Sequence, residues 1–363
     1  MSELPEHIET RLRASFEDET CVVTGGAGFI GSHVVETLLR LGASVRVIDD
    51  LSTSTLDTLG AMFLGAPQRL HFVRGSILDP SAVSEVMRGA KYVFHLAAVC
   101  SVPRSIEYPE RTWAVNATGT LRVVRAAQAS GAARVIYSAS SSAYGNSPGL
   151  PKHEGDLPAP VSPYAASKLA GEHVIAASAE TYGVSGVSLR YFNVFGPRQR
   201  PDTPYAGVVP AFASKLLQGE PPVVHGDGGQ SRDFTYVDNV VFANALAAIA
   251  DLPKPGAVLN VATEGRVSVL ELAERLGSIL ASSGGQPLGV EHAPPRGGDV
   301  RHSQADISAA RDILGYEPIV DFMSGLERTA AWHVDQRSGN GLDDEGDAGP
   351  GSAPDTSGDG GTR

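Results

Sequence analysis

Two residues four positions apart, Tyr164 and Lys168, could together carry out acid–base chemistry on an alcohol. In a helix, residues at this spacing lie on the same face, so the phenol and the ammonium can act on one substrate. A tyrosine with an ordinary pKa of about 10 is a poor base at neutral pH, and a nearby positive charge favours its phenolate. By itself this spacing is common, but together with the glycine-rich segment that precedes it in the chain it predicts a proton-transfer pair for the oxidation of a hydroxyl group.

A glycine-rich segment near the N-terminus predicts the partner of that oxidation. Gly25, Gly28 and Gly31 lie between an apolar strand and a helix. The first allows a tight turn, the second lets a diphosphate approach the backbone, and the third lets the helix pack close to the strand. Asp49 follows the next strand, where a carboxylate accepts both hydroxyls of the adenosine ribose and repels a 2′-phosphate. The pattern predicts that the cofactor is NAD rather than NADP.

The elements that position these residues alternate between strand and helix. Apolar runs predict strands at 21–24, 44–48, 71–73, 92–96, 134–137 and 187–191, and helical spacing predicts helices at 30–41, 114–130 and 164–182. Residues 146–162, rich in Pro and Gly, are predicted to form a surface loop, and further helices are predicted at 240–250 and 269–278. Such alternation is typical of a parallel sheet with helices on both faces.

The predicted fold class is therefore α/β, a Rossmann-type doubly wound parallel sheet with a smaller C-terminal substrate-binding domain. Irregular proline spacing after Phe195 indicates where the smaller domain begins. We expect four parts: an N-terminal extension at 1–18, the NAD-binding domain at 19–193 with later segments returning to it, a mainly substrate-binding domain at 194–335, and a disordered tail at 336–363.

Composition limits the classes of partner. With 42% hydrophobic and 19% charged residues, the chain has the composition of a globular protein. A net charge of −12 argues against general affinity for nucleic acid. No apolar run is long enough for a signal core or a membrane span, so we expect a cytoplasmic protein without membrane partners. The two cysteines, Cys21 and Cys100, predict neither a disulfide framework nor a metal site.

Nine ordered motifs resemble those of the extended short-chain dehydrogenase/reductases, specifically the nucleotide-sugar epimerase and dehydratase group. The resemblance runs from about Glu19 to Trp332. Its motifs are TGGAGFIGSH at 24–33, DDLS at 49–52, HLAA at 95–98, NATGT at 116–120, SSSAYG at 140–145, SPYAASKLAGE at 162–172, RYFNVFGPRQRP at 190–201, GDGGQSRDFTYVDN at 226–239 and RGGDVRHSQAD at 296–306.

The resemblance implies roles for the catalytic and cofactor-binding residues. Ser140 is expected to hydrogen-bond the reacting oxygen of the sugar and Tyr164 to remove its proton while hydride passes to NAD. Lys168 is expected to hold the nicotinamide ribose. The cofactor-binding set implied by the resemblance is Gly25, Gly28, Phe29, Ile30, Gly31, Asp49, Asp50, Ser76, Ile77, Leu96, Ala97, Ala98, Asn116, Tyr164, Lys168 and Tyr191.

The resemblance also implies a UDP-sugar site. Asn193, Arg232 and Arg296 are expected to meet the diphosphate, which suits bidentate guanidinium groups. The other residues expected at the substrate are Ser141, Ser142, Arg200, Val209, His225 and Ser303. Members of the family often form dimers through two helices, which here are those at 114–130 and 164–182, so we expect a homodimer.

The residues after Ser140 indicate the reaction. Related dehydratases carry Asp-Glu directly after this serine, and decarboxylating members carry Glu two residues before the tyrosine at 144. This chain has Ser141 and Ser142 there. Without a further carboxylate, the simplest chemistry is oxidation to a 4-keto sugar, rotation of that sugar and return of hydride to its other face, which is 4-epimerization.

Two sugars fit the remaining positions. Arg200 resembles an arginine associated with the carboxylate in uronate 4-epimerases, and the hydroxyls of Ser140, Ser141 and Ser142 could bind a C6 carboxylate. Ser303 stands where many relatives have a bulky aromatic residue, which leaves room for an N-acetyl group. We favour UDP-glucuronate over UDP-N-acetylglucosamine. A non-catalytic NAD-binding scaffold is the alternative of another class, and it would be marked by loss of the tyrosine or the lysine.

Overall fold

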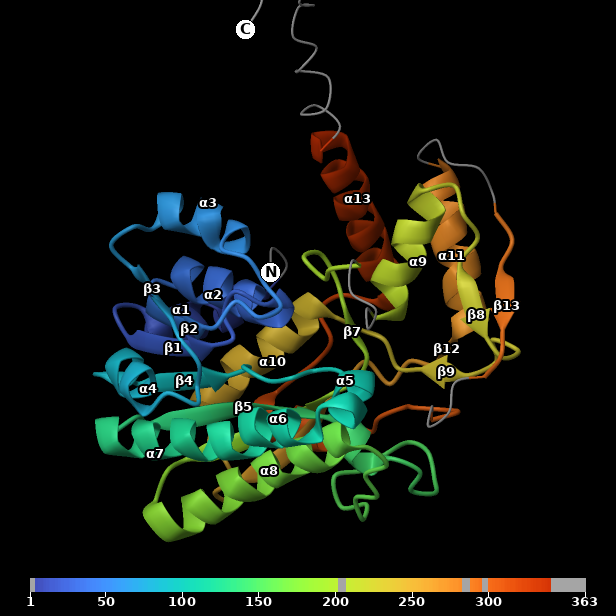
Figure 1. The fold of residues 1–363 in the computed structure, drawn as a ribbon. Coiled ribbons are helices and arrows are strands. Elements are labelled where there is room, and N and C mark those ends of the chain that lie inside the picture. Colours follow the sequence, from blue (N-terminus) through green and yellow to red (C-terminus); the bar gives the residue numbers. More distant parts are fainter. Residues whose placement is uncertain (1–3, 202–206, 283–287, 296–299, 341–363) are drawn as a thin grey trace, which may run out of the picture.

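A seven-stranded parallel sheet forms the centre of the molecule (Figure 1). The computed structural model describes residues 4–201, 207–282, 288–295 and 300–340. In spatial order the strands are β3 (Leu70–Arg74), β2 (Ser44–Asp49), β1 (Thr20–Thr24), β4 (Tyr92–His95), β5 (Arg134–Ser140), β6 (Gly186–Tyr191) and β11 (Ala257–Val261). This is the Rossmann order with one added edge strand, which confirms the predicted fold class. The order reverses between β1 and β4, so a crevice opens at their carboxyl ends.

Helices cover both faces of the sheet (Figure 1). On one face lie α2 (Phe29–Arg40) and α10 (Val237–Ile249), which contact each other; on the other lie α4 (Pro80–Met87), α7 (Thr120–Ser130) and α8 (Pro163–Tyr182). Successive side chains of a strand point to opposite faces of the sheet. In β1, Val22 and Val23 are accordingly both fully buried but belong to different hydrophobic clusters. The sheet therefore has a separate core on each face.

The N-terminal segment contains a helix that the sequence pattern did not predict. Helix α1 (Glu6–Phe16) buries Leu12 and Phe16 completely and carries charged residues elsewhere. The ring of Phe16 packs edge-on against Tyr92, with 5.3 Å between centroids. Ile8, Leu12 and Phe16 follow one another at intervals of four residues and form one apolar face among charged residues, and this face packs on the core of the sheet.

The helix predicted at 114–130 is divided in the structure. Residues Ala114–Gly119 form a π-helix, and α7 continues from Thr120 to Ser130, where Gly131 ends it in the left-handed conformation. The wider turn is crowded, since a Cβ on Gly119 would lie 2.6 Å from the side chain of Ile77. A π-turn changes the direction of the residues within it and is frequent at functional sites. Here it contains Asn116, which is buried.

The smaller part lies beyond the carboxyl edge of the sheet (Figure 1). Its elements are α9 (Val208–Leu217), β8 (Val223–His225), β9 (Ser231–Arg232), β12 (Val267–Ser268), α11 (Val269–Ser282), β13 (Glu291–Ala293) and α13 (Phe322–Asn340). Helix α10 and strand β11 return to the sheet. Helix α13 continues into the range predicted as tail, and residues 341–363 lie outside the described part.

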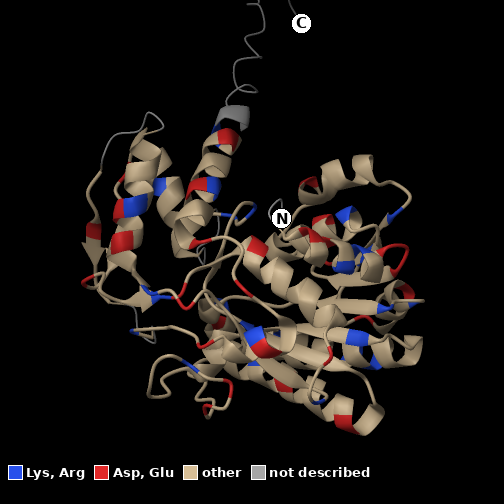
Figure 2. Cartoon of the chain, turned by 180° about the vertical axis from the view of Figure 1, so that it is seen from behind, with Lys and Arg blue, Asp and Glu red and all other residues tan. Residues whose placement is uncertain are grey.

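Seen from behind, acidic and basic residues are interspersed over the described part of the ribbon (Figure 2). In that same part of the chain, no helix is both long and apolar enough to cross a membrane. Nor do three or more His, Cys, Asp or Glu side chains gather there in a way that could hold a metal ion. Cys21 is buried and Cys100 is exposed, and both are free thiols.

The close packing of α2 on β1 gives a first prediction. A Cβ on Gly31 would lie 2.1 Å from the carbonyl oxygen of Gly25, so Gly31→Ala must displace the start of the helix. We expect urea denaturation to show a loss of about 1–3 kcal/mol in the free energy of unfolding, together with weaker NAD binding. Gly60→Ala is the control, because nothing lies within 4 Å of its Cβ position in α3 (Asp57–Gly65). A Gly31→Ala midpoint equal to the wild-type midpoint would contradict this packing.

Candidate active site

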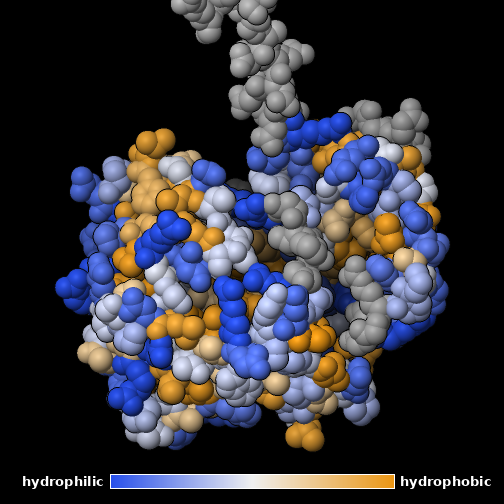
Figure 3. Space-filling view, in the orientation of Figure 1, coloured by the Kyte–Doolittle hydropathy of each residue, from blue (hydrophilic) through white to orange (hydrophobic). Residues whose placement is uncertain are grey.

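A cavity of about 1420 Å³ lies at the carboxyl edge of the sheet, between the sheet and the smaller part. Its walls include the ends of β1, β2, β4, β5 and β6, and seen from one side the surface is hollowed between the two parts (Figure 3). Binding sites for one small ligand usually measure about 300–1,000 Å³. The cavity is therefore large enough to hold a dinucleotide and a second ligand together.

The glycine loop forms one end of this cavity. Gly25 has φ +72° and donates its N–H to the carbonyl of Ile48 at 2.8 Å, and a Cβ on it would lie 2.7 Å from the backbone nitrogen of Ala97. At Gly28 a Cβ would meet only the carbonyl of Gly25, at 3.2 Å. Gly28 is the N-cap of α2 and no side chain caps the helix, so the first N–H groups can bind an anion. This cradle fits the diphosphate of NAD.

Asp49 ends β2 at the same edge, and its carboxylate lines the cavity. It accepts hydrogen bonds from the backbone N–H groups of Ala27 at 3.0 Å and Leu51 at 2.9 Å, and from the hydroxyl of Ser54 at 3.2 Å. Burial raises the pKa of Asp49, which these hydrogen bonds oppose. Oδ1 accepts two of these hydrogen bonds and Oδ2 accepts one, so Oδ2 keeps a lone pair for a further donor such as a ribose hydroxyl.

The loop after β4 is held against the glycine loop by a chain of hydrogen bonds. Thr120 donates to the carbonyl of Asn116 at 2.6 Å, so its oxygen accepts from Nε2 of His95 at 2.9 Å. Nδ1 of His95 then accepts from the hydroxyl of Thr24 at 2.7 Å, and that oxygen accepts from the N–H of Ala97 at 3.1 Å. Burial lowers the pKa of His95 to about 3, so the ring is neutral and has a single tautomer.

Asn116 lies behind this loop rather than on the cavity wall. Its side chain is 1% exposed, donates to the carbonyl of Val99 at 3.1 Å and to the hydroxyl of Ser167 at 2.9 Å, and accepts from the N–H of Val99 at 2.8 Å. It therefore joins the loop to α8. Leu96, Ala97 and Ala98 themselves line the cavity.

The tyrosine and lysine lie in the first turns of α8, with Ser162 as the N-cap. Both line the cavity. Lys168 is 2% exposed, and its Nζ lies 4.6 Å from the centre of the Tyr137 ring. Burial lowers the pKa of Lys168 to about 8. Burial likewise raises the pKa of Tyr164 well above its usual range, as does nearby Cys100, whereas a hydrogen bond with Ser140 lowers it.

Ser140 ends β5, which is longer than predicted, and lies opposite Tyr191 of β6. Its Oγ accepts from the backbone N–H of Ser142 at 3.2 Å and from the Ser142 hydroxyl at 2.8 Å. Because these contacts use the oxygen as an acceptor, the Ser140 proton can point to Tyr164 or to a substrate oxygen. Ser141 and Ser142 begin a 3-10 helix and also line the cavity.

The predicted cofactor and substrate residues are distributed in three ways. Most of them line the cavity: Gly25, Gly28, Phe29, Ile30, Gly31, Asp49, Asp50, Ser76, Ile77, Leu96, Ala97, Ala98, Ser140, Ser141, Ser142, Tyr164, Lys168, Tyr191, Asn193, Arg200, Arg232 and Ser303. Val209 lies in the hydrophobic core, 2% exposed, and Nδ1–H of His225 donates to the carbonyl of Pro294 at 2.9 Å; neither residue is on the wall. Arg296 lies outside the described residues.

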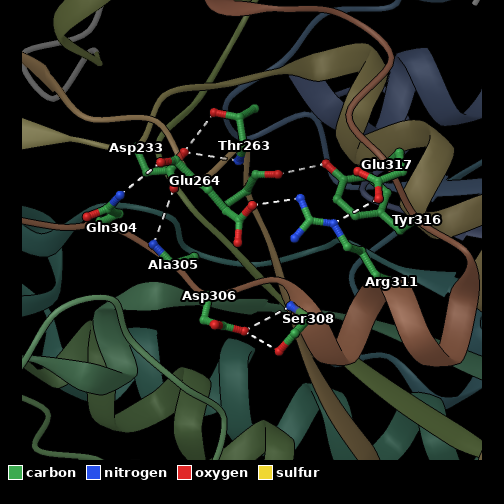
Figure 4. Close-up of polar contacts among 11 residues, drawn as sticks. Asp233, Thr263, Glu264, Gln304, Ala305, Asp306, Ser308, Arg311, Tyr316 and Glu317 are labelled. Carbon is green, nitrogen blue, oxygen red and sulfur yellow. Dashed lines mark hydrogen bonds and ion pairs between the residues drawn. The ribbon is translucent and has the colours of Figure 1, made fainter.

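A buried carboxylate joins the segments that carry Arg232 and Ser303. Asp233 is fully buried and accepts from the N–H and hydroxyl of Thr263 at 3.0 and 2.9 Å and from the N–H of Ala305 at 3.2 Å (Figure 4). Burial raises the pKa of Asp233 to about 6, against these hydrogen bonds. Residues from three separate loops are thereby fixed around one side chain.

Several cavity residues gave no sequence signal. Lys152 lies in the predicted surface loop but is 4% exposed, because its backbone bridges Ala305 and its ammonium donates to the carbonyl and hydroxyl of Ser147. His302 lines the wall beside Ser303, and α13 contributes His333. A lone lysine or histidine has no recognisable spacing, so only contacts between distant segments place these residues here.

The acidic residues of the wall are confined to one end. Among the described residues, the carboxylates that line the cavity are those of Asp49, Asp50 and Asp57, all in or after β2. The region around Tyr164 is lined instead by hydroxyl, amide and cationic groups. Through Tyr164 this region can exchange a proton with a hydroxyl group. Among the described residues it offers no carboxyl group as a further acid or base.

Fold and site together define a Rossmann-type, NAD-dependent enzyme that works on a second ligand in the same cavity. Residues 21–262 match the NAD dependent epimerase/dehydratase family. The chain belongs to that family.

Individual relatives cover nearly the whole described chain. A UDP-glucose 4-epimerase of Mycolicibacterium smegmatis is 37% identical over 85% of this chain and 96% of its own. The structure is also similar to a UDP-N-acetylglucosamine 4-epimerase from Methanobrevibacter ruminantium, with 38% identity, a TM-score of 0.82 and coverage of 88% and 99%. A UDP-glucuronic acid 4-epimerase from Bacillus cereus, solved with NAD, has 30% identity, a TM-score of 0.78 and coverage of 87% and 99%.

The buried ammonium of Lys168 gives a second prediction. It has no ion-pair partner in the described part of the chain, and its pKa falls from 10.5 to about 8, so the charged form destabilises the folded state at pH 7. We expect Lys168→Met to raise the free energy of unfolding of the cofactor-free protein by about 1–3 kcal/mol. The folded state binds fewer protons than the unfolded state between pH 8 and 10.5, so the wild type gains stability over that range and the difference shrinks.

Lys91→Met is the matched control, since Lys91 forms a partly exposed ion pair with Glu19 at 2.6 Å, and this contact raises the pKa of Lys91. Its removal should change the stability by no more than about 1 kcal/mol. A Lys168→Met protein that unfolds more easily than the wild type at pH 7 would show that the ammonium is stabilising.

Proposed function

We propose that the chain interconverts the C4 epimers of a UDP-sugar. The observation that carries this proposal is the absence of a carboxylate around Tyr164 among the described cavity residues. Elimination of water from the sugar needs an added acid–base pair, whereas epimerization needs only one group that removes and returns a proton. The related 4-epimerases support the same reaction.

The residues at the end of β5 and on α8 supply the acid–base part of the reaction. Ser140 donates its free hydroxyl proton in a hydrogen bond to the C4 oxygen of the sugar. Tyr164 takes the proton of the C4 hydroxyl. Lys168 favours the phenolate and holds the nicotinamide ribose. NAD, when bound, supplies the acceptor and donor of hydride at C4. After the 4-keto sugar turns its other face, Tyr164 returns the proton and the chain is restored.

UDP-glucuronate is the proposed substrate. Three adjacent hydroxyls, those of Ser140, Ser141 and Ser142, line the cavity together with Arg200, and these groups suit a C6 carboxylate. A 4-keto uronate is a β-keto acid that readily loses CO₂, so its carboxylate must be fixed in an unproductive orientation. Hydroxyl groups can do this without acting as acids. Lys152 adds a buried cation to the same cavity.

UDP-N-acetylglucosamine is the second candidate. Ser303 lines the cavity and its small side chain leaves space beside the sugar. The similar enzyme from Methanobrevibacter ruminantium, a UDP-N-acetylglucosamine 4-epimerase, also supports this substrate. A non-catalytic NAD-binding scaffold has less support, since Tyr164 and Lys168 are both present and both line the cavity.

Product analysis with a panel of UDP-sugars tests the function and the substrate. We expect the chain to interconvert UDP-glucuronate and UDP-galacturonate without net consumption of NAD. Tyr164→Phe should lower turnover by at least about 10²-fold while NAD remains bound, because only the proton-transferring hydroxyl is removed. Conversion of UDP-N-acetylglucosamine but not of UDP-glucuronate would select the second candidate, and full activity of Tyr164→Phe would assign the base to another residue.

We also propose that the chain forms a homodimer through α7 and α8. Large apolar side chains are exposed on these helices, with Leu121 at 43% and Tyr182 at 43%, and Arg125 stacks on the Tyr182 ring at 5.1 Å. Exposed apolar groups clustered on adjoining helices are typical of an interface.

Sedimentation of two glutamate variants tests this dimer. Leu121→Glu should convert the dimer to a monomer, because a charge in an apolar interface lacks solvation. Leu64→Glu is the matched control, since Leu64 is 87% exposed on α3, away from these helices. A monomeric wild type, or a dimer that survives Leu121→Glu, would contradict the proposed interface.

A further inference from the structure

Three side chains from separate segments form a short relay at the edge of the cavity. Ser231 belongs to β9, Arg266 precedes β12, which pairs with β9, and His302 is bridged to Ser231 through the backbone. Arg266 Nε lies 3.0 Å from Ser231 Oγ, and that oxygen lies 2.8 Å from His302 Nδ1. His302 lines the cavity together with Arg232 and Ser303.

The relay fixes which nitrogen of His302 carries the proton. A guanidinium group can only donate, so Ser231 Oγ accepts from Arg266. The hydroxyl proton of Ser231 is then directed to His302, and Nδ1 is the acceptor. In the neutral ring the proton must therefore be on Nε2. Because Nδ1 is occupied by Ser231, Nε2–H is the polar group that His302 can present to the cavity.

Positive charges surround this ring. Burial lowers the pKa of His302, and Arg266, Arg301 and Arg232 lower it further, whereas Asp227 raises it. Asp227 is itself paired with Arg301 at 2.8 Å. Arg232 lies alongside, with Nη1 donating to the backbone carbonyls of Ser231 at 2.9 Å and Arg301 at 3.2 Å. The ring thus stays neutral until an anion offsets the arginines.

We propose that His302 is a further substrate-binding residue, whose Nε2–H donates to the diphosphate of the nucleotide-sugar beside Arg232 and whose ring takes up a proton from solvent when that dianion binds. The added proton enters at Nδ1; the Ser231 hydroxyl then turns its own proton away from the ring, and its oxygen accepts from both His302 Nδ1–H and Arg266 Nε–H. The assignment rests on the proposed function, since it requires a UDP-sugar in this cavity. A diphosphate is the part of such a ligand that needs several donors and cations at once. Arg266 acts through Ser231 and is a positioning residue.

Calorimetry tests both parts of this assignment. UDP-glucose is titrated into the NAD-bound Tyr164→Phe chain, which prevents turnover, at pH 6 and 7 in two buffers of different ionization enthalpy. Its diphosphate is esterified at both ends and does not titrate in this range, so buffer-dependent heat reports protons taken up by the protein. We expect the Tyr164→Phe chain to take up protons when UDP-glucose binds. Adding His302→Gln to that chain should abolish the uptake and weaken binding of UDP-glucose by about tenfold or more.

His292→Gln is the matched control. His292 lies on β13 in the same part of the chain and uses Nδ1 to hold a backbone carbonyl, that of Gly226 at 2.8 Å, but it does not line the cavity. The His292→Gln variant should bind UDP-glucose with unchanged affinity and unchanged proton uptake. Arg266→Leu removes one of the charges that keep His302 neutral, so its proton uptake should move to a higher pH, which a merely structural role would not cause.

The outcomes separate this assignment from the proposed function. If neither UDP-glucose nor UDP binds the chain, both fall. If both ligands bind and His302→Gln changes neither affinity nor proton uptake, only the assignment falls. A loss of affinity for UDP-glucose with unchanged affinity for UDP would also overturn it, because the contact would then be with the sugar.

Discussion

The site depends first on the approach of helix α2 to strand β1. A Cβ on Gly31 would lie 2.1 Å from the Gly25 carbonyl, and one on Gly25 would lie 2.7 Å from the Ala97 nitrogen, so only glycine allows the helix and two strand ends to meet. Thr24 and His95 hold Ala97 at that distance through hydrogen bonds of 3.1 and 2.7 Å. This contact fixes where an anion can lie at the helix N-terminus, and the cavity extends from there to Tyr164.

Different kinds of interaction hold each half of the cavity in place. The sheet half is built from backbone hydrogen bonds and apolar cores, and the side chains of Thr24, His95 and Thr120 join two of its loops. In the described part of the other half the strands are two or three residues long, and the loops are joined through buried polar groups. Asp233 binds the backbones of Thr263 and Ala305, while Asn260 binds those of Lys152 and Asp306. Loss of Asp233 leaves backbone donors without an acceptor, and loss of Asn260 leaves two backbone carbonyls without a donor, so both residues are costly to replace.

Two buried cations near the reaction centre, Arg190 and Lys168, differ in whether a carboxylate pairs with them. Arg190 and Glu172 form a buried bidentate pair at 2.9 and 2.7 Å, and the guanidinium lies 4.6 Å from the centre of the Tyr144 ring, so each charge is compensated. Lys168, one helical turn from Glu172, forms no ion pair in the described part of the chain, and its Nζ lies 4.6 Å from the centre of the Tyr137 ring. A lysine left without a carboxylate destabilises the apo fold, yet its full charge is then available to the phenolate and to the cofactor ribose. His95, in contrast, carries no charge into the site. Burial keeps its ring neutral, and the ring serves to position the backbone.

The sequence by itself determined the features that lie within one element or one turn. The glycine loop, Asp49 at the end of β2 and the pair Tyr164 and Lys168 follow from helix and strand periodicity, which is local, and so do the alternating elements of the sheet. Tertiary structure alone placed Asn116 behind the cofactor loop and Val209 in the core, packed α1 on the sheet, and brought Lys152 and His302 to the cavity. His302 lies 71 residues from Ser231, its hydrogen-bond partner. Contacts at such separations depend on how whole elements pack, and no local pattern encodes them.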